Sequence, residues 1–147
     1  MIQIRYADFE DYELITAIDD SIDKGRFLTW TQNKQAIIAL VDGQLAGWLQ
    51  YNLFMERLPF INRLYLFEKY QRQGIGTGMV KFWECEMLDK GCSQLMLSTE
   101  KSNSALEFYK KLGYKELGSF DYFGEHTELM LGKTVTIEQF MCHCKRQ

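Results

Sequence analysis

The sequence is short of proline, of histidine and of long hydrophobic runs. A single proline among 147 residues leaves little room for disordered linkers. No stretch of about 18 consecutive apolar residues occurs, so we expect no membrane-spanning helix. Basic residues are not in excess either, because the formal net charge is -3. This charge argues against a nucleic-acid binder with a broad basic face. We therefore expect neither a membrane nor a nucleic acid as partner.

The sequence also lacks the marks of export. Its N-terminal segment has neither the basic start nor the apolar stretch of a signal peptide, and its four cysteines show no disulfide spacing. We expect a cytoplasmic protein with reduced thiols. One interpretation of Cys142, His143 and Cys144 is a metal site. Three crowded ligands at a chain end, however, lack the second half of a zinc site. We expect an ordinary tail and no metal.

The composition is that of one soluble globular domain. The 147 residues, 46% of them apolar, suffice to bury a core without disulfides. We therefore expect a single domain over residues 1–147. Residues 132–147 are compatible with a C-terminal helical tail that packs on a partner, which leaves a homodimer open beside a monomer.

The N-terminal part of the chain predicts a strand, a helix and an irregular segment. Residues 2–6 alternate apolar and polar side chains, as a short strand does. Asp8 stands where a helix N-cap belongs. Residues 25–35 lack a clean period, and we interpret Phe27 and Trp30 as core anchors rather than as part of a substrate pocket. The apolar residues at helical spacing after the cap are Tyr12, Ile15, Ile18 and Ile22.

The middle of the chain predicts an antiparallel meander of three strands. Asp42-Gly43, between two apolar runs, is typical of a two-residue hairpin turn. A second turn over residues 55–59 leads into a strand over residues 60–67, which is rich in aromatic and branched side chains.

The C-terminal half predicts helices and strands in alternation. Its expected elements are a helix from Thr77 to a stop at Gly91, a strand over 93–99, a helix over 104–113 and strands over 114–120 and 126–133. The order strand, helix, strand over residues 60–99 implies a parallel crossover. We expect an α/β fold with a mixed, mostly antiparallel twisted sheet of six to seven strands, one parallel pair, and helices on both faces.

Three glycines follow the strand over residues 60–67 and precede the main helix. Gly74, Gly76 and Gly78 allow backbone N–H groups to converge on one point, to which the helix N-terminus adds its dipole. A phosphate or pyrophosphate is the natural occupant. A Walker A loop needs Lys and Ser or Thr after the last glycine, where this chain has Met79, and the spacing does not match a Rossmann fingerprint. A helix-starting turn without any ligand remains an alternative.

The context of these glycines carries a family resemblance. The segment LYLFEKYQRQGIG resembles the coenzyme A signature of the GNAT superfamily of N-acetyltransferases, with Gln71, Gly74 and Gly76 at the signature positions. ALEFYKKLGY, residues 105–114, resembles the family's second motif. The expected order of strands and helices is also the order of this family, so the resemblance covers nearly the whole chain.

The resemblance implies acetyl-CoA as the donor and no metal. The family's splayed strand before the glycine turn holds the pantetheine arm, and its turn cradles the pyrophosphate with backbone N–H groups. Many members also contact the cofactor through an Asn, for which this chain offers Asn103, one residue late; the alternative for Asn103 is a helix N-cap. The cofactor-binding residues implied are Leu64, Tyr65, Leu66, Arg72, Gln73, Gly74, Ile75, Gly76, Thr77 and Asn103.

The resemblance also implies how the acetyl group is transferred. The backbone N–H of Leu66 stabilises the oxyanion, and Tyr109 is the general acid that protonates the departing thiolate; the alternative for Tyr109 is a core aromatic beside Phe108. Some members carry a Glu as general base where this chain has Ser98. The base is therefore unassigned, with a water relay or one of four side chains as candidates: Glu56, Glu100, Asp121 and His126.

Three functions follow from these alternatives. The first is an N-acetyltransferase that acts on a primary amine of a small molecule or a peptide. The second is a non-catalytic or regulatory module that binds acyl-CoA on the same fold. The third is an interaction domain in which the glycine turn only starts a helix.

Overall fold

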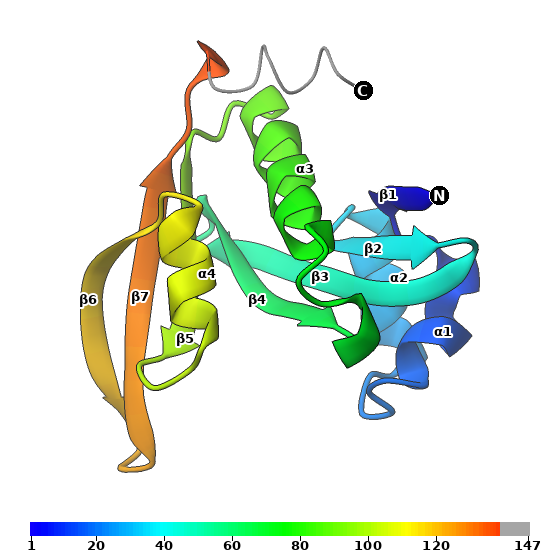
Figure 1. Cartoon of the computed structure of the whole chain (residues 1–147), viewed down its shortest axis with the longest axis horizontal. Coiled ribbons are helices and arrows are strands. Elements are labelled where there is room, and N and C mark those ends of the chain that lie inside the picture. The colour runs from blue at the N-terminus through cyan, green and yellow to red at the C-terminus, as the bar shows by residue number, and fades with distance from the viewer. Residues whose placement is uncertain (139–147) are drawn as a thin grey trace. The chain divides into compact units, whose positions relative to one another are not determined.

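The computed structural model describes residues 1–138, which form a mixed seven-stranded sheet with helices (Figure 1). The strands follow the order β1-β2-β3-β4-β5-β7-β6. The strands are β1 (Ile2–Tyr6), β2 (Ala36–Val41), β3 (Gln44–Phe54), β4 (Leu58–Leu66), β5 (Gln94–Glu100), β6 (Lys115–Tyr122) and β7 (His126–Thr134). The α-helices are α1 (Tyr12–Thr16), α2 (Lys24–Gln32), α3 (Ile75–Asp89) and α4 (Ala105–Lys111), and the 3-10 helices are η1 (Phe9–Asp11) and η2 (Glu68–Tyr70).

The predicted mixture of antiparallel and parallel pairing is confirmed. β4 and β5 form the parallel pair, with Phe60 opposite Met96 and Ile61 opposite Leu97. The β1–β2, β2–β3, β5–β7 and β6–β7 pairs are antiparallel. The widening of β4 from β5 that the family resemblance implies stays a prediction. Among the described residues, no helix combines the length and the apolar character needed to cross a membrane.

The chain divides into two compact units. The first contains residues 1–52 and 63–83, and the second contains residues 53–62 and the chain from Glu84 onward. The first unit holds the glycine turn, and the second holds Tyr109. The prediction of one domain over 1–147 stays a prediction.

In the first unit, helices cover both faces of the β1-β2-β3 sheet. On one face, Ile38 and Trp48 join Phe27 and Trp30 of α2 in one buried cluster. On the other face, the Tyr51 ring meets the α3 residue Trp83 edge-on, with 5.9 Å between ring centroids. Alternate residues of a strand point to opposite faces, so the alternating pattern supplies both cores. This arrangement anchors α3 and the turn before it.

The hairpin and the helix stop signals are confirmed. Asp42 and Gly43 have φ angles of 50° and 81°, as the predicted two-residue turn requires. Gly91 follows α3 with a φ of 86°, and Gly113 follows α4 with a φ of 97°. The left-handed backbone at both positions explains why a glycine ends each helix.

The prediction for residues 8–35 is partly wrong. Asp8 does cap a helix, because its side chain accepts the N–H of Glu10, but that helix is η1, and α1 ends already at Thr16. The segment interpreted as irregular contains α2, which Asp23 caps. Its mostly polar surface hides the helical period in the sequence, because few of its positions are buried.

In the second unit, β7 lies between β5 and β6. Gln94 is opposite Thr134 in the β5–β7 ladder, so residues 132–134 are strand. The prediction of a helical tail from residue 132 is therefore wrong at its start, because these residues continue the ladder with β5. Residues 139–147, with Cys142, His143 and Cys144, lie outside the described residues.

Candidate active site

The glycine turn between η2 and α3 is held by its own glutamines. Gln71 donates its side-chain N–H to the Leu66 carbonyl at 3.0 Å. Gln73 does the same to the Lys69 carbonyl at 2.8 Å. Arg72 and Gly74 have φ angles of 63° and 82°, so the chain reverses sharply here. The Gln71 of the motif thus ties the turn to the end of β4.

The turn exposes backbone donors without acceptors. Within the described part of the chain, the N–H groups of residues 72–77 have no hydrogen-bond acceptor, whereas Gly78 already donates to the Gly74 carbonyl at 3.0 Å. The first N–H groups of a helix lack intrahelical partners, and the helix dipole makes this end positive. Ile75 is 2% exposed and packs the first turn of α3 into the core. These free donors at a helix start are the arrangement that suits an anion, and binding of a pyrophosphate here stays a prediction.

The predicted pantetheine strand passes very close to β3. A Cβ atom on Gly47 would lie 2.6 Å from the Leu66 side chain and closer still to the Tyr65 carbonyl oxygen. Phe67 donates its N–H to the Ala46 carbonyl at 3.0 Å, which extends the contact. Only glycine permits this approach. Sequence reasoning missed Gly47, although a glycine inside a strand pattern is a signal of close backbone packing.

Tyr109 lies in the core of the second unit. Its side chain is 6% exposed, and its ring meets the Tyr114 ring edge-on at 5.8 Å and the Phe108 ring at 5.1 Å. Burial raises the pKa of the Tyr109 phenol, so the hydroxyl stays protonated at neutral pH. A protonated phenol is able to donate a proton but not to accept one. The hydroxyl is therefore a proton donor, but burial makes it a weaker acid, and its packing also suits a core aromatic.

A buried charged cluster supports this part of the core. Glu84, 2% exposed on α3, accepts the Tyr114 hydroxyl at 2.7 Å and the Lys133 ammonium at 3.1 Å. Burial and the Glu84 carboxylate together raise the pKa of Tyr114. Sequence reasoning missed this cluster, although a glutamate beside Trp83 in the apolar stripe of a helix is a visible signal.

The Asn103 side chain is already hydrogen-bonded at the start of α4. Its side-chain oxygen accepts the N–H of Ala105 at 2.8 Å, so it satisfies one of the first N–H groups of α4. Ser104 holds the N-cap position itself without a side-chain cap bond, so Asn103 stands one residue before the cap that the sequence left open. Contact of Asn103 with a cofactor stays a prediction.

The candidate bases differ in their surroundings. Glu56 lies in the β3–β4 turn with a φ of 60°, and Glu100 is exposed at the end of β5. Asp121 accepts the N–H of Gly124 at 3.1 Å. His126 lies 3.2 Å from the carboxylate of Glu128, a residue that sequence reasoning did not consider. Among the described residues, no group of acidic, histidine and cysteine side chains is placed to hold a metal ion.

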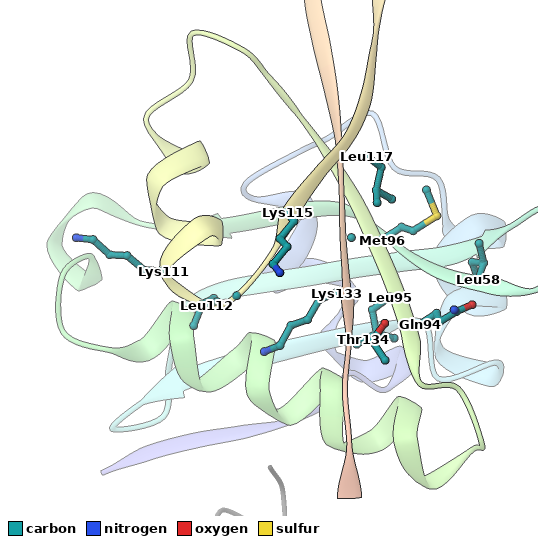
Figure 2. Close-up of a pocket in the computed structure, with 12 residues that line it drawn as sticks. Leu58, Gln94, Leu95, Met96, Lys111, Leu112, Lys115, Leu117, Lys133 and Thr134 are labelled. Atoms are coloured by element: carbon teal, nitrogen blue, oxygen red, sulfur yellow. The ribbon is translucent and has the colours of Figure 1, made fainter. Parts of the chain in front are cut away.

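A separate cavity of about 730 Å³ opens in the second unit. Figure 2 shows Leu58, Met96 and Leu117 on one side of it and Lys111 on the other. Its lining includes none of the predicted cofactor-binding or catalytic residues. Lys133, which also lines it, is paired with Glu84.

Comparison with known proteins identifies relatives over much of the chain. A thialysine N-epsilon-acetyltransferase of Bos taurus is 32% identical over 93 residues, which are 58% of this chain and 55% of that protein. The N-alpha-acetyltransferase 30 of Homo sapiens is 32% identical over 99 residues, which are 64% of this chain and 27% of that protein. The chain thus spans about half of the first relative and about a quarter of the second.

A solved structure confirms the fold. The crystal structure of the PaiA N-acetyltransferase from Thermoplasma acidophilum, in complex with coenzyme A, has a TM-score of 0.75 at 21% identity. The likeness covers 92% of this chain and 99% of that one. Residues 2–114 match the family described as "Acetyltransferase (GNAT) family". Since this match includes both the glycine turn and the second motif, the chain belongs to the acetyltransferase (GNAT) family.

Proposed function

We propose that this protein is an N-acetyltransferase that moves an acetyl group from acetyl-CoA to a primary amine. The observation that carries the proposal is the turn at residues 72–77, whose N–H groups have no acceptor within the described chain. Family membership supports the reaction, and the PaiA structure that shares the fold contains coenzyme A. Both curated relatives are named as N-acetyltransferases, one for the N-epsilon position of thialysine and one for an N-alpha position.

The first unit holds the donor in this proposal. The N–H groups of residues 72–77 bind the pyrophosphate oxygens, and the guanidinium of Arg72 adds a charge at the exposed side of the turn. Leu64, Tyr65 and Leu66 offer backbone groups to the pantetheine arm, in the manner of an added strand. Gly47 keeps this segment close to β3.

The second half of the proposal is proton transfer. Bound acetyl-CoA supplies an activated thioester carbonyl. The N–H of Leu66 stabilises the negative charge that develops on the carbonyl oxygen when the amine attacks. The hydroxyl of Tyr109, which is protonated at neutral pH, supplies the proton that the departing sulfur needs.

Calorimetry with coenzyme A and a transfer assay test the proposal. We expect binding of coenzyme A, and release of free CoA from acetyl-CoA with at least one amine from a panel of small amines, amino acids and peptide N-termini. Gly76→Glu places a carboxylate in the anion site and should abolish both. Gly118→Glu adds the same charge on β6, where the space around the glycine is open, and should leave coenzyme A binding unchanged. Absence of coenzyme A binding by the unaltered chain would refute the proposal.

A non-catalytic acyl-CoA-binding module is the second candidate. The observation that favours it is Ser98 on β5, because a hydroxyl replaces the glutamate that some family members use as base. The same two assays separate the candidates. Coenzyme A binding without turnover for any amine, unaltered by Tyr109→Phe, would favour the binding module.

A further inference from the structure

The cavity of the second unit is built from that unit alone. It is bordered by β4, β5, β6, β7 and the end of α4, and the described residues that line it all belong to residues 53–62 or to the chain from Glu84 onward. Its volume of about 730 Å³ falls within the range of about 300–1,000 Å³ that is typical of small-molecule pockets. None of the residues placed above in donor binding or proton transfer lines it. The cavity is therefore a separate candidate site for a small molecule.

The floor of this cavity is Gly132 of β7. Gly132 is opposite Met96 in the β5–β7 ladder and opposite Lys115 in the β6–β7 ladder. The Leu117 side chain lies over Gly132, because a Cβ atom there would be 2.6 Å from it. β6 has a bulge at this point, and a bulge re-aims a side chain relative to the regular strand. Met96, Lys115 and Leu117 therefore share one face of the sheet.

An apolar wall runs along this face. Phe60 of β4 is opposite Met96, and Leu58 stands two residues before Phe60, so the Leu58 side chain is on the same face. Leu117 is 60% exposed, which leaves much of this apolar side chain in water. Three strand spacings, about 14 Å in all, separate β6 from β4. In the view of Figure 2, Leu58, Met96 and Leu117 lie on one side of the cavity and Lys115 lies on the other.

Lys115 brings a positive charge to the end of this wall. Among the described lining residues, three are lysines and none is acidic. Lys133 follows Gly132 in β7, so it points to the opposite face, where it is paired with Glu84. Within the described part of the chain, Lys115 has no ion-pair partner. An unpaired ammonium group beside an apolar wall favours a ligand that is both anionic and apolar.

The carboxylate that follows Lys115 in the sequence does not neutralise this charge. Glu116 is opposite Leu131 in the β6–β7 ladder, whereas Lys115 is opposite Gly132. Successive residues of a strand point to opposite faces of the sheet, so the Glu116 carboxylate points away from the face of Lys115. Glu116 is paired on its own side with Lys110 of α4, at 3.6 Å. The Lys115 ammonium therefore remains available to a ligand.

We propose that this cavity binds an amphipathic monocarboxylate, such as a medium-chain fatty acid, at residues distinct from those of acetyl transfer. The carboxylate accepts hydrogen bonds from the Lys115 ammonium. The hydrocarbon chain removes Leu117, Met96 and Leu58 from water, which is the favourable step for an exposed apolar wall. A neutral hydrocarbon would leave the ammonium unpaired, and a small inorganic anion would leave the wall in water. Lys115 would repel a cation of the same shape.

Calorimetry with three simple probes tests the chemical class of the ligand. We expect the unaltered chain to bind octanoate more tightly than hexanoate, by up to about fourfold for each of the two additional methylenes. Octylammonium has the same chain with the opposite charge, and it should bind at least about tenfold more weakly than octanoate. Absence of octanoate binding at millimolar concentration would overturn the proposal, as would equal affinities for octanoate and octylammonium.

Two variants and a matched control test the residues. Lys115 and Leu117 are both exposed, so the fold should tolerate their replacement. Lys115→Glu should weaken octanoate binding at least about tenfold. Leu117→Ser should reduce the difference between octanoate and hexanoate, because less apolar surface meets the longer chain. Lys110→Glu makes the same change of charge on α4 outside the cavity lining, and it should stay within about threefold of the unaltered chain.

The location of the site is tested with coenzyme A. Saturating coenzyme A should leave the Kd of octanoate within about threefold. Displacement of octanoate would place it at the turn over residues 72–77 and would overturn the proposal. Equal weakening by Lys110→Glu and Lys115→Glu would also overturn it, because it would show only a general attraction to positive charge. None of these measurements uses acetyl transfer, so their failure leaves the proposed function untouched.

Discussion

Gly47→Ala should damage both stability and coenzyme A binding, although the change adds a single methyl group. The new Cβ would lie 2.6 Å from the Leu66 side chain and even nearer to the Tyr65 carbonyl oxygen. A flexible side chain is able to move away, but the Tyr65 oxygen belongs to the backbone of β4. Inserting a methylene into a packed site costs about 1–3 kcal/mol. The rigid neighbour places this site at the upper end of that range.

The same displacement should appear in binding. If β4 shifts away from β3, Leu64, Tyr65 and Leu66 lose their position for the pantetheine arm, while the turn at residues 72–77 keeps its donors. A loss of about 1.4 kcal/mol in binding corresponds to a tenfold weaker Kd. We therefore expect coenzyme A affinity to fall by about tenfold, which is less than the complete loss expected for Gly76→Glu.

Urea unfolding and calorimetry measure the two effects. Gly118→Ala is the matched control, because Gly118 is also a strand glycine and a Cβ there meets no atom within 4 Å. We expect Gly118→Ala to unfold within about 0.5 kcal/mol of the unaltered chain. Equal stability and equal coenzyme A affinity for Gly47→Ala would show that β4 does not depend on this close approach.

The remaining predictions concern catalysis, core charge and acid stability. Tyr109→Phe should lower kcat by about 10²-fold with an unchanged Kd for coenzyme A, because it removes only the proton donor; an unchanged kcat would leave Tyr109 a core aromatic. Glu84→Ala should cost about 3 kcal/mol in urea unfolding, since it leaves the Lys133 ammonium without its carboxylate; a cost below about 1 kcal/mol would contradict this. Burial acts to raise the pKa of Asp11, but hydrogen bonds, chiefly from Arg5 at 2.8 Å, outweigh it and lower the pKa below its usual value. The ionised Asp11 carboxylate therefore stabilises the fold fully above about pH 4, and this stabilisation is lost as the pH falls through the lowered pKa. Between pH 6 and pH 2, the Tm of Asp11→Asn should fall less than that of the unaltered chain. Equal losses of Tm would refute the linkage.

Local signals in the chain were sufficient for most of the fold. Asp42-Gly43 specifies its hairpin because the turn needs two residues at positive φ, and few residue pairs tolerate that backbone. Apolar side chains at helical spacing predicted α3 and α4, because each buries one stripe. α2 was not predicted, because it buries only a few side chains. The largest of them, Phe27 and Trp30, are too few to show a helical period.

The two halves of the candidate site differed in how far they were predictable. The turn at residues 72–77 is built from consecutive residues, so glycine spacing and the following helix were enough to predict its shape and to suggest an anion site. Gly47 acts on Tyr65 across two strands, and no local pattern states which strand will pass that close. The burial of Glu84 against Tyr114 and Lys133 likewise depends on three distant segments.

The amino-acid order alone thus specified most of the elements, a turn suited to an anion, and the family. Those features arise from backbone preferences and from residues that are neighbours along the chain. Which groups each side chain contacts was decided only by the tertiary structure. His126 was one of four candidate side chains for the base in the sequence, beside a water relay, and only the β6–β7 ladder shows that it lies against Glu128 and the Tyr122 ring. Hydrogen bonds and ring contacts depend on distances of a few ångströms, and only the pairing of strands sets those distances.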